Sequence, residues 1–315
     1  MYQAAKHIEN NFEIIELKSP SVHAKIAVNL GNMLFSLKKH SKELLYFPYS
    51  PEAYRSNAKL AGNPFMHPWA NRLEHDGILV EGAPYLFPEA QKDLLYKDGN
   101  DLPLHGLLLK SDKWKTLEIF EDSASCHHLA ELDFGDEKAL SIFPYRHKIR
   151  MKHELKEERL IIETTLINLD EKNMPVSFGF HPYFLVDPAS RSGCTLTVPA
   201  TEVITTDEKM IPQGEAGLKE NKWDFIHDRI ALDKLSFDHG FQHLKRGEDG
   251  KAIFKLNDIE VIFDEHYAFA QLYAPDAADK PYVCIEPMTA ATNALNRDTC
   301  RTIRKNESFS AVFSI

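Results

Sequence analysis

A carboxylate and an imidazole stand out because each combines a titratable side chain with a constrained backbone. His181 is enclosed by aromatic residues in Phe178–Phe184, and Glu286 lies at the end of an apolar run in Cys284–Ala290. A glutamate in such a run is costly to bury unless it is paired, so we expect a partner or a cleft beside it. Both residues precede proline, which restricts their backbones to extended conformations. The two could serve as a preorganised acid and base, and a structural role for each is the alternative.

Hydrogen-bonding residues mark two further segments. Asn71 and Arg72 are neighbours close to Trp69, a combination suited to a hydroxyl-rich ligand. The alternative is a proline-rich crossover that carries an exposed arginine. His105 is held between apolar residues in Leu104–Leu107. A lone histidine in such a place is more often structural than functional.

Several common catalytic motifs are missing from the sequence. It holds no G-x-S-x-G, no P-loop and no G-x-G-x-x-G, which disfavours serine hydrolases, nucleotidases and dinucleotide enzymes. Its histidines form no short-spaced ligand cluster, so nothing in the pattern demands a metal. The cysteines are far apart and form no C-x-x-C pair, and reduced thiols in the cytoplasm are the simplest interpretation. They are Cys126, Cys194, Cys284 and Cys300.

Composition and charge exclude several classes of partner. The 315 residues carry 47 Asp and Glu against 37 Lys and Arg, with a formal net charge of −10. This acidic balance, without a basic cluster, argues against nucleic acid and anionic membrane as partners. No run approaches 18 apolar residues, and the N-terminal stretch lacks the apolar region of a signal peptide. We therefore expect a cytoplasmic protein whose oligomeric state the sequence leaves open.

Strands must position these side chains, because the dominant hydrophobic period is two. Phe309–Ile315 alternates apolar and polar residues, and a turn at 305–307 predicts a C-terminal hairpin with Thr302–Arg304. Ala252–Leu256 with Ile259–Phe263, and His153–Leu155 with Leu160–Asn168, predict two more hairpins. Further expected strands are Lys25–Leu30, Met33–Lys38, Leu117–Phe120, His128–Phe134, Thr195–Val198 and Tyr267–Tyr273.

Helical signals are sparse by comparison. Pro51–Ala58 could form one short turn of helix, and little else keeps a 3.6-residue period. Many strands with frequent turns and no alternation with helices predict an all-β fold, an antiparallel sandwich or barrel. No stretch resembles an interdomain linker. We therefore expect a single all-β domain over residues 1–315.

Four motifs, taken in order, resemble those of the aldose 1-epimerases, or galactose mutarotases. They are Asn-Arg at 71–72, Leu-His-Gly at 104–106, Gly-Phe-His-Pro-Tyr-Phe at 179–184 and Glu-Pro-Met-Thr at 286–289. The resemblance runs from Ala24–Leu37, through a hairpin at Gly77–Leu86, to Glu286–Asn293. It implies a large antiparallel β-sandwich with few short helices, the galactose mutarotase-like supersandwich. It also implies interconversion of the α and β anomers of a free aldose, without a metal or an organic cofactor.

The resemblance also assigns roles to individual residues. His181 resembles the family's general acid, and Glu286 resembles its general base. Arg72 and His105 resemble residues on the sugar-binding, ring-oxygen side, and Asn71 joins them as a substrate-binding residue. A further Asp that binds sugar hydroxyls falls at Asp238, with Asp233 and Asp224 as alternatives nearby.

The chemistry of mutarotation suits these residue types. The anomeric hydroxyl loses a proton while the ring oxygen gains one, so the ring opens to the aldehyde and recloses on the other face. A carboxylate and an imidazole can carry both transfers near neutral pH. Their ordinary pKa values predict a bell-shaped pH profile, with the carboxylate limb on the acid side and the imidazole limb on the alkaline side.

Two alternatives to a free-sugar epimerase stay open at this point. A hexose-6-phosphate 1-epimerase would share the acid and base but need a phosphate clamp, for which Arg72 and Arg146 are candidates. A non-catalytic carbohydrate-binding protein could keep the fold and lose the reaction. A glycoside hydrolase is disfavoured, because it would usually need two carboxylates and only Glu286 is well placed.

Overall fold

The computed structural model describes residues 1–57, 59–217, 229–233, 235–275 and 280–315. In this part of the chain, antiparallel strands form three large sheets and two short pairs. The first sheet has five strands that follow the chain order. They are β1 (Gln3–Glu9), β2 (Phe12–Lys18), β3 (Val22–Ala27), β4 (Met33–Lys39) and β5 (Lys42–Glu43). The predicted early strand pair is therefore present as β3 and β4, and the strand expected over Lys25–Leu30 ends earlier because a turn joins the Asn32 N–H to the Val28 carbonyl.

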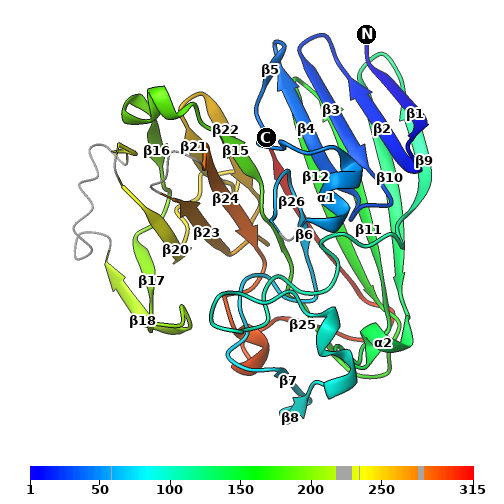
Figure 1. Ribbon diagram of the computed structural model, residues 1–315, viewed down its shortest axis with the longest axis vertical. Coiled ribbons are helices and arrows are strands. Elements are labelled where there is room, and N and C mark those ends of the chain that lie inside the picture. The colour runs from blue at the N-terminus through cyan, green and yellow to red at the C-terminus, as the bar shows by residue number, and fades with distance from the viewer. Residues whose placement is uncertain (58, 218–228, 234, 276–279) are drawn as a thin grey trace.

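A nine-stranded sheet connects the two sides of the molecule (Figure 1). Its strands, in spatial order, are β19 (Arg229–Ala231), β16 (Thr195–Thr197), β21 (Ala252–Leu256), β22 (Ile259–Phe263), β26 (Ser308–Ser314), β12 (Arg159–Asn168), β11 (His147–Lys156), β10 (Ser125–Phe134) and β9 (Lys115–Glu121). The five-stranded sheet packs on its β10–β12 half. These two layers form one side of a sandwich.

An eight-stranded sheet lies on the other side (Figure 1). It contains β18 (Pro212–Gly217), β17 (Glu202–Thr206), β20 (Phe237–Gln242), β23 (Phe269–Ala274), β24 (Tyr282–Met288), β14 (Gly179–Phe180) and β6 (Phe65–Met66), with β15 (Tyr183–Leu185) paired to β24. The short pairs are β7 (Gly77–Val80) with β8 (Ala83–Leu86), and β13 (Met174–Pro175) with β25 (Thr302–Ile303). The named strands of the described residues all pair in antiparallel registers, so the predicted all-β antiparallel sandwich is confirmed.

The helices of the described residues are short. They are α1 (Pro51–Ser56), α2 (Glu137–Leu140) and the 3-10 turns η1 (Glu89–Leu94), η2 (Pro188–Gly193) and η4 (Ala294–Asn296). The helix expected over Pro51–Ala58 is α1, which begins after Ser50, whose hydroxyl accepts the Ala53 N–H. Residue 58 lies outside the described residues. None of these helices is long and apolar enough to cross a bilayer.

The predicted C-terminal hairpin is wrong, although its turn exists. The Glu307 N–H donates to the Arg304 carbonyl, but β25 pairs with β13 while β26 lies between β12 and β22. β26 buries Phe309, Ala311 and Phe313. β12 pairs along β26 from Ser308 to Ser314, β22 pairs with its end at Phe313 and Ser314, and β25 pairs with β13 instead. The other two predicted hairpins are confirmed as β21–β22 and β11–β12.

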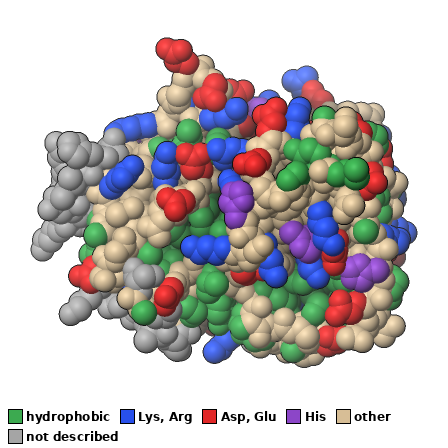
Figure 2. Space-filling model, turned by 90° about the horizontal axis from the view of Figure 1, so that it is seen from above, with side chains coloured by type: hydrophobic (Ala, Val, Ile, Leu, Met, Phe, Trp, Pro, Cys, Tyr) green, Lys and Arg blue, Asp and Glu red, His purple; other side chains and the backbone are tan. Residues whose placement is uncertain are grey.

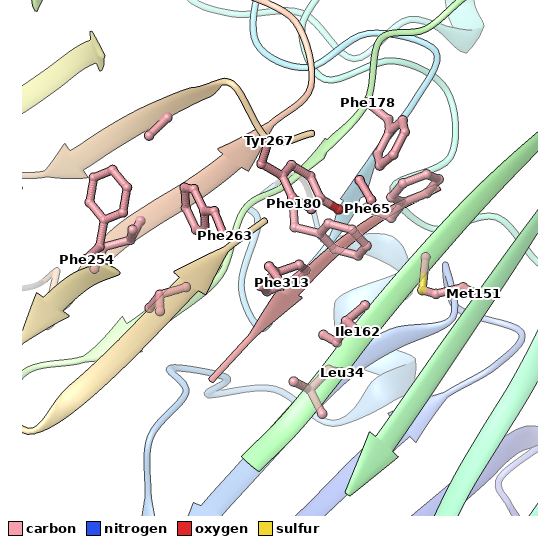
Figure 3. Packing of buried hydrophobic residues seen from close by; sticks show 14 of the residues in the cluster. Leu34, Phe65, Met151, Ile162, Phe178, Phe180, Phe254, Phe263, Tyr267 and Phe313 are labelled. Carbon is pink, nitrogen blue, oxygen red and sulfur yellow. The ribbon is translucent and has the colours of Figure 1, made fainter. Parts of the chain in front are cut away.

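Aromatic side chains join the sheets at the centre of the core (Figure 3). The Phe180 ring lies 4.9 Å from Phe313 of β26 and 5.1 Å from Phe65 of β6. The same cluster of buried residues extends from Ile15 to Phe313. A single domain over residues 1–315 would require such a shared core, and the single-domain assignment stays a prediction. Because Phe65 and Phe180 are fixed in this core, the segments that follow them, with Asn71, Arg72 and His181, start from rigid positions.

Charged side chains of both signs are mixed on the upper face of the molecule. Figure 2 shows basic and acidic groups interspersed over this face rather than separated into one large patch. Such a surface gives no extended field of one sign for a polyanion.

Candidate active site

A cavity of about 210 Å3 opens over strands β20, β23 and β24. Pockets for drug-sized ligands measure about 300–1,000 Å3, so this one suits a molecule of about the size of a monosaccharide. Every site residue predicted from the sequence lines it. The lining consists of Asn71, Arg72, His105, His181, Asp238 and Glu286, together with Leu60, Tyr96, Leu104, Tyr183, Gln271 and Tyr273. Their assignment to a functional site stays a prediction.

The predicted acid and base face each other inside this cavity. His181 Nε2 lies 3.3 Å from Glu286 Oε1, and the two side chains are only 7% and 1% exposed. Glu286 sits within β24, while His181 lies between β14 and β15, which both pair with that strand. The His181 N–H donates to the Pro64 carbonyl, and the Tyr183 ring stacks on the imidazole at 4.5 Å. The expectation that a buried Glu286 has a partner therefore holds.

Burial shifts both pKa values toward the neutral forms. Loss of water, with a smaller contribution from the charge of Asp238, raises the pKa of Glu286 well above its ordinary value. Loss of water and the nearby Arg72 charge lower the pKa of His181 to about 3. Both shifts favour a protonated carboxyl beside a neutral imidazole over the charged pair. The neutral pair has the same number of protons as a carboxylate beside an imidazolium.

Arg72 is held on several sides by acceptors. Its Nε–H donates to Asp98 Oδ2 at 2.7 Å, and an Nη1–H donates to Asn71 Oδ1 at 3.0 Å. Its Nη2 lies 3.7 Å from Asp238 Oδ2. The Arg72 side chain is 15% exposed, so the exposed-arginine alternative for this segment is wrong.

The His105 segment is fastened to the same loop. The backbone N–H of His105 donates to the Asn71 carbonyl at 2.9 Å. Leu104 and Arg72 form an isolated antiparallel β-bridge. The His105 ring stands edge-on to His181 at 5.1 Å, and burial lowers its pKa well below the ordinary value. His105 therefore presents a neutral imidazole to the cavity.

Asp238 and Gln271 line the cavity from the neighbouring strands β20 and β23. Gln271 Nε2 donates to Asp238 Oδ1 at 2.6 Å, and Gln271 stands opposite Glu286 in the β23–β24 register. Of the alternatives to Asp238, Asp233 does not line the cavity, and Asp224 lies outside the described residues.

Three cavity residues also carry a buried polar atom that has no partner among the described residues. These atoms are His105 Nδ1, His181 Nδ1 and Glu286 Oε2. An unsatisfied buried polar atom costs about 1–3 kcal/mol, so each of these atoms is available to a polar ligand.

Sequence reasoning missed some residues in and around the cavity. Gln271 gave a signal, as the single polar residue between Ala270 and Leu272 in a buried strand, whereas Asp98 in a turn gave none. Trp69, which stacks on Phe87, belongs to the core rather than to the cavity.

A phosphate clamp built from two arginines is absent from the described lining. The Arg146 side chain is 60% exposed and pairs with Asp133 at 3.5 Å, away from the cavity. Among the described residues, three side chains place possible metal-ligand atoms close together: Glu202, Glu215 and His243. None of these three lines the cavity.

The fold and cavity together define a β-sandwich protein of the galactose mutarotase-like type. The chain belongs to the aldose 1-epimerase family, whose model matches residues 13–315. Among solved structures it is similar to a galactose mutarotase-like protein from Clostridium acetobutylicum, at 21% identity and a TM-score of 0.84, over 99% of this chain and 97% of that one. It is also similar to galactose 1-epimerase from Lactobacillus acidophilus, at 17% identity and a TM-score of 0.75, over 100% and 97% of the two chains. At these identities the structural likeness establishes the fold alone.

Proposed function

We propose that the protein is an aldose 1-epimerase that interconverts the α and β anomers of a free aldose. The observation that carries this proposal is the contact of 3.3 Å between His181 and Glu286 in a cavity of about monosaccharide size. Family membership supports the reaction class. The reduced, widely spaced thiols favour the cytoplasm as its compartment.

In the proposed mechanism, the proton shared by the pair first moves from Glu286 to His181 across their 3.3 Å contact. Glu286 then takes the proton of the anomeric hydroxyl while His181 gives its proton to the ring oxygen. The C1–ring-oxygen bond breaks, and the aldehyde forms. After rotation about C1–C2, the same groups return the protons and the ring closes on the other face. Positioned general acids and bases each contribute about 10²–10⁴-fold, and no covalent intermediate is required.

The remaining wall groups bind and orient the sugar in this proposal. Arg72 offers N–H donors, Asp238 offers a carboxylate, and Asn71 and His105 offer further polar atoms toward the hydroxyls. Their contacts with each other keep them in place before the sugar arrives. Such preorganisation lowers the entropy cost of binding a small polar ligand.

The purified protein is expected to accelerate α/β interconversion of glucose or galactose after exhaustive chelation. The reason is that the proposed proton transfers use only side chains of the protein. The measurement is magnetisation-exchange NMR on a panel of aldoses and their 6-phosphates, with the spontaneous rate as the control. Activity that disappears on chelation and returns with a divalent ion would contradict the proposal.

The pH profile of kcat/KM is expected to be a broad bell. His181 is expected to set its acid limb and Glu286 its alkaline limb, the reverse of the assignment made from the sequence. The acid limb reports a second proton entering the pair at the lowered pKa of His181, about 3. The alkaline limb reports loss of the shared proton at the raised pKa of Glu286. Between these limits the proton count of the pair is constant, so the rate stays level.

Rates measured across the pH range, with buffer catalysis subtracted, test this assignment. An acid limb near the ordinary carboxylate pKa, with an alkaline limb near the ordinary imidazole pKa, would restore the assignment expected from the sequence.

A further inference from the structure

Asp98 lies behind Arg72 rather than in the cavity lining, and both of its carboxylate oxygens are used. Oδ2 accepts the Arg72 Nε–H at 2.7 Å, while Oδ1 accepts the backbone N–H groups of Asn100 at 2.8 Å and Leu102 at 3.0 Å. Its side chain is only 7% exposed. One carboxylate therefore joins the guanidinium to a closed turn of the chain.

The first consequence of this contact is geometric. A guanidinium presents its N–H donors in a rigid plane, so fixing the Nε edge fixes the direction of the others. The remaining edge of Arg72 points toward Asn71 and Asp238, which both line the cavity. Without Asp98, the long side chain would regain rotamer freedom that a ligand must then remove.

The second consequence is electrostatic. Arg72 contributes the one positive charge among the cavity-lining residues that the structure describes. Asp98 at 2.7 Å and Asp238 at 3.7 Å place two negative charges beside it. Burial lowers the pKa of His105 and His181, which keeps both imidazoles neutral. The described wall therefore has no uncompensated cation.

We propose that Asp98 is a positioning residue that orients Arg72 and cancels its charge, so that the cavity selects uncharged sugar hydroxyls over phosphate esters. This inference rests on the proposed function, whose substrate it restricts. A phosphate monoester carries a charge of about −1.5 to −2 near neutral pH and is best held by a free guanidinium edge. Here one edge is occupied and the charge is already balanced.

Asp98→Asn is the sharpest test, because the amide keeps one oxygen for the turn and loses the charge. Its NH2 group cannot accept the Arg72 Nε–H. Dissociation constants for glucose and glucose 6-phosphate would be measured by NMR titration, and KM and kcat by magnetisation exchange. The wild type is expected to bind glucose at least about tenfold tighter than the phosphate. In the variant, that ratio is expected to shift at least about tenfold toward the phosphate.

The same variant is expected to separate KM from kcat. KM for glucose should rise about tenfold, the loss typical of a charge-assisted hydrogen bond, while kcat stays within about threefold. Asp98→Glu keeps the charge but moves the carboxylate by one methylene. It is expected to raise KM and to leave the ratio of the two dissociation constants within about threefold of the wild type.

Asp76→Asn is the matched control. Asp76 pairs with Lys92 at 3.2 Å and Lys97 at 3.1 Å, so its replacement changes the net charge by the same amount close to Asp98 but outside the cavity. Its ratio of dissociation constants should equal that of the wild type. Equal shifts in the Asp76 and Asp98 variants, or a wild type that binds the phosphate as tightly as glucose, would overturn the role of Asp98.

Failure of the proposed epimerase function can be distinguished from failure of the role proposed for Asp98. A wild type that binds glucose without accelerating anomerisation contradicts the reaction, while the ratio of dissociation constants still decides the role of Asp98. Absence of binding to either sugar overturns both proposals.

Discussion

Glu286→Gln is expected to lower kcat for anomerisation by at least about 10²-fold, and His181→Asn by a similar factor, the lower end of what a general base or acid contributes. Glutamine keeps the shape of Glu286 but cannot accept the anomeric proton. Asparagine keeps a hydrogen-bond donor at position 181 without a titratable ring. Because the two groups act in one proton relay, the double variant should lose much less than the product of the single losses.

The folded state is expected to tolerate the change at Glu286. The carboxyl is buried and its raised pKa already favours the neutral form, which glutamine imitates. Thermal unfolding of the four proteins, alongside their anomerisation rates, separates loss of chemistry from loss of fold. Glu131→Gln is a suitable control, since this carboxylate pairs with Lys148 and Arg150 on the nine-stranded sheet, outside the cavity. Near-normal turnover in a folded Glu286→Gln protein would remove Glu286 as the base.

The alternation of side chains made the longer strands predictable. β12 and β26 alternate between buried and half-buried positions, so local sequence and final environment agree. The pairing of strands was harder to predict, because the edge of a strand can pair with any other strand that the fold brings beside it. The predicted hairpin of Thr302–Arg304 with Phe309–Ile315 failed for this reason, since Thr302 and Ile303 pair with the distant strand β13 while β26 pairs with β12.

The candidate site was predictable where residue type and local constraint coincide. Glu286 in an apolar run and His181 among aromatic residues both depart from ordinary core composition, and the structure places them together. Their proximity depends on the register of β24 with β14 and β15, which has no local sequence signal. Asp98 was missed because an aspartate beside Gly99 is typical of an ordinary turn, and its contact with Arg72 depends on tertiary structure.

Gly106→Ala is expected to destabilise the protein by about 2–4 kcal/mol, through a positive-φ cost and overpacking. Gly106 has φ +71, and an added Cβ would lie 2.2 Å from the carbonyl oxygen of His67. That oxygen accepts the Leu107 N–H at 2.7 Å, so the two segments cannot separate without losing this bond. His105 would move with its neighbour, and a misplacement of about 1 Å can cost 10²-fold in rate.

The Gly106→Ala prediction has a matched control in Gly82, which has φ +78 and no atom within 4 Å of an added Cβ. Gly82→Ala carries the same backbone cost, about 1 kcal/mol, without the collision. Chemical denaturation of both variants therefore isolates the contribution of the close approach between Gly106 and His67. Because Gly82 lies in the β7–β8 turn outside the cavity lining, Gly82→Ala should keep the wild-type anomerisation rate. Equal destabilisation of the two variants, with activity retained in both, would show that the loop at His105 adapts freely and is not fixed by this contact.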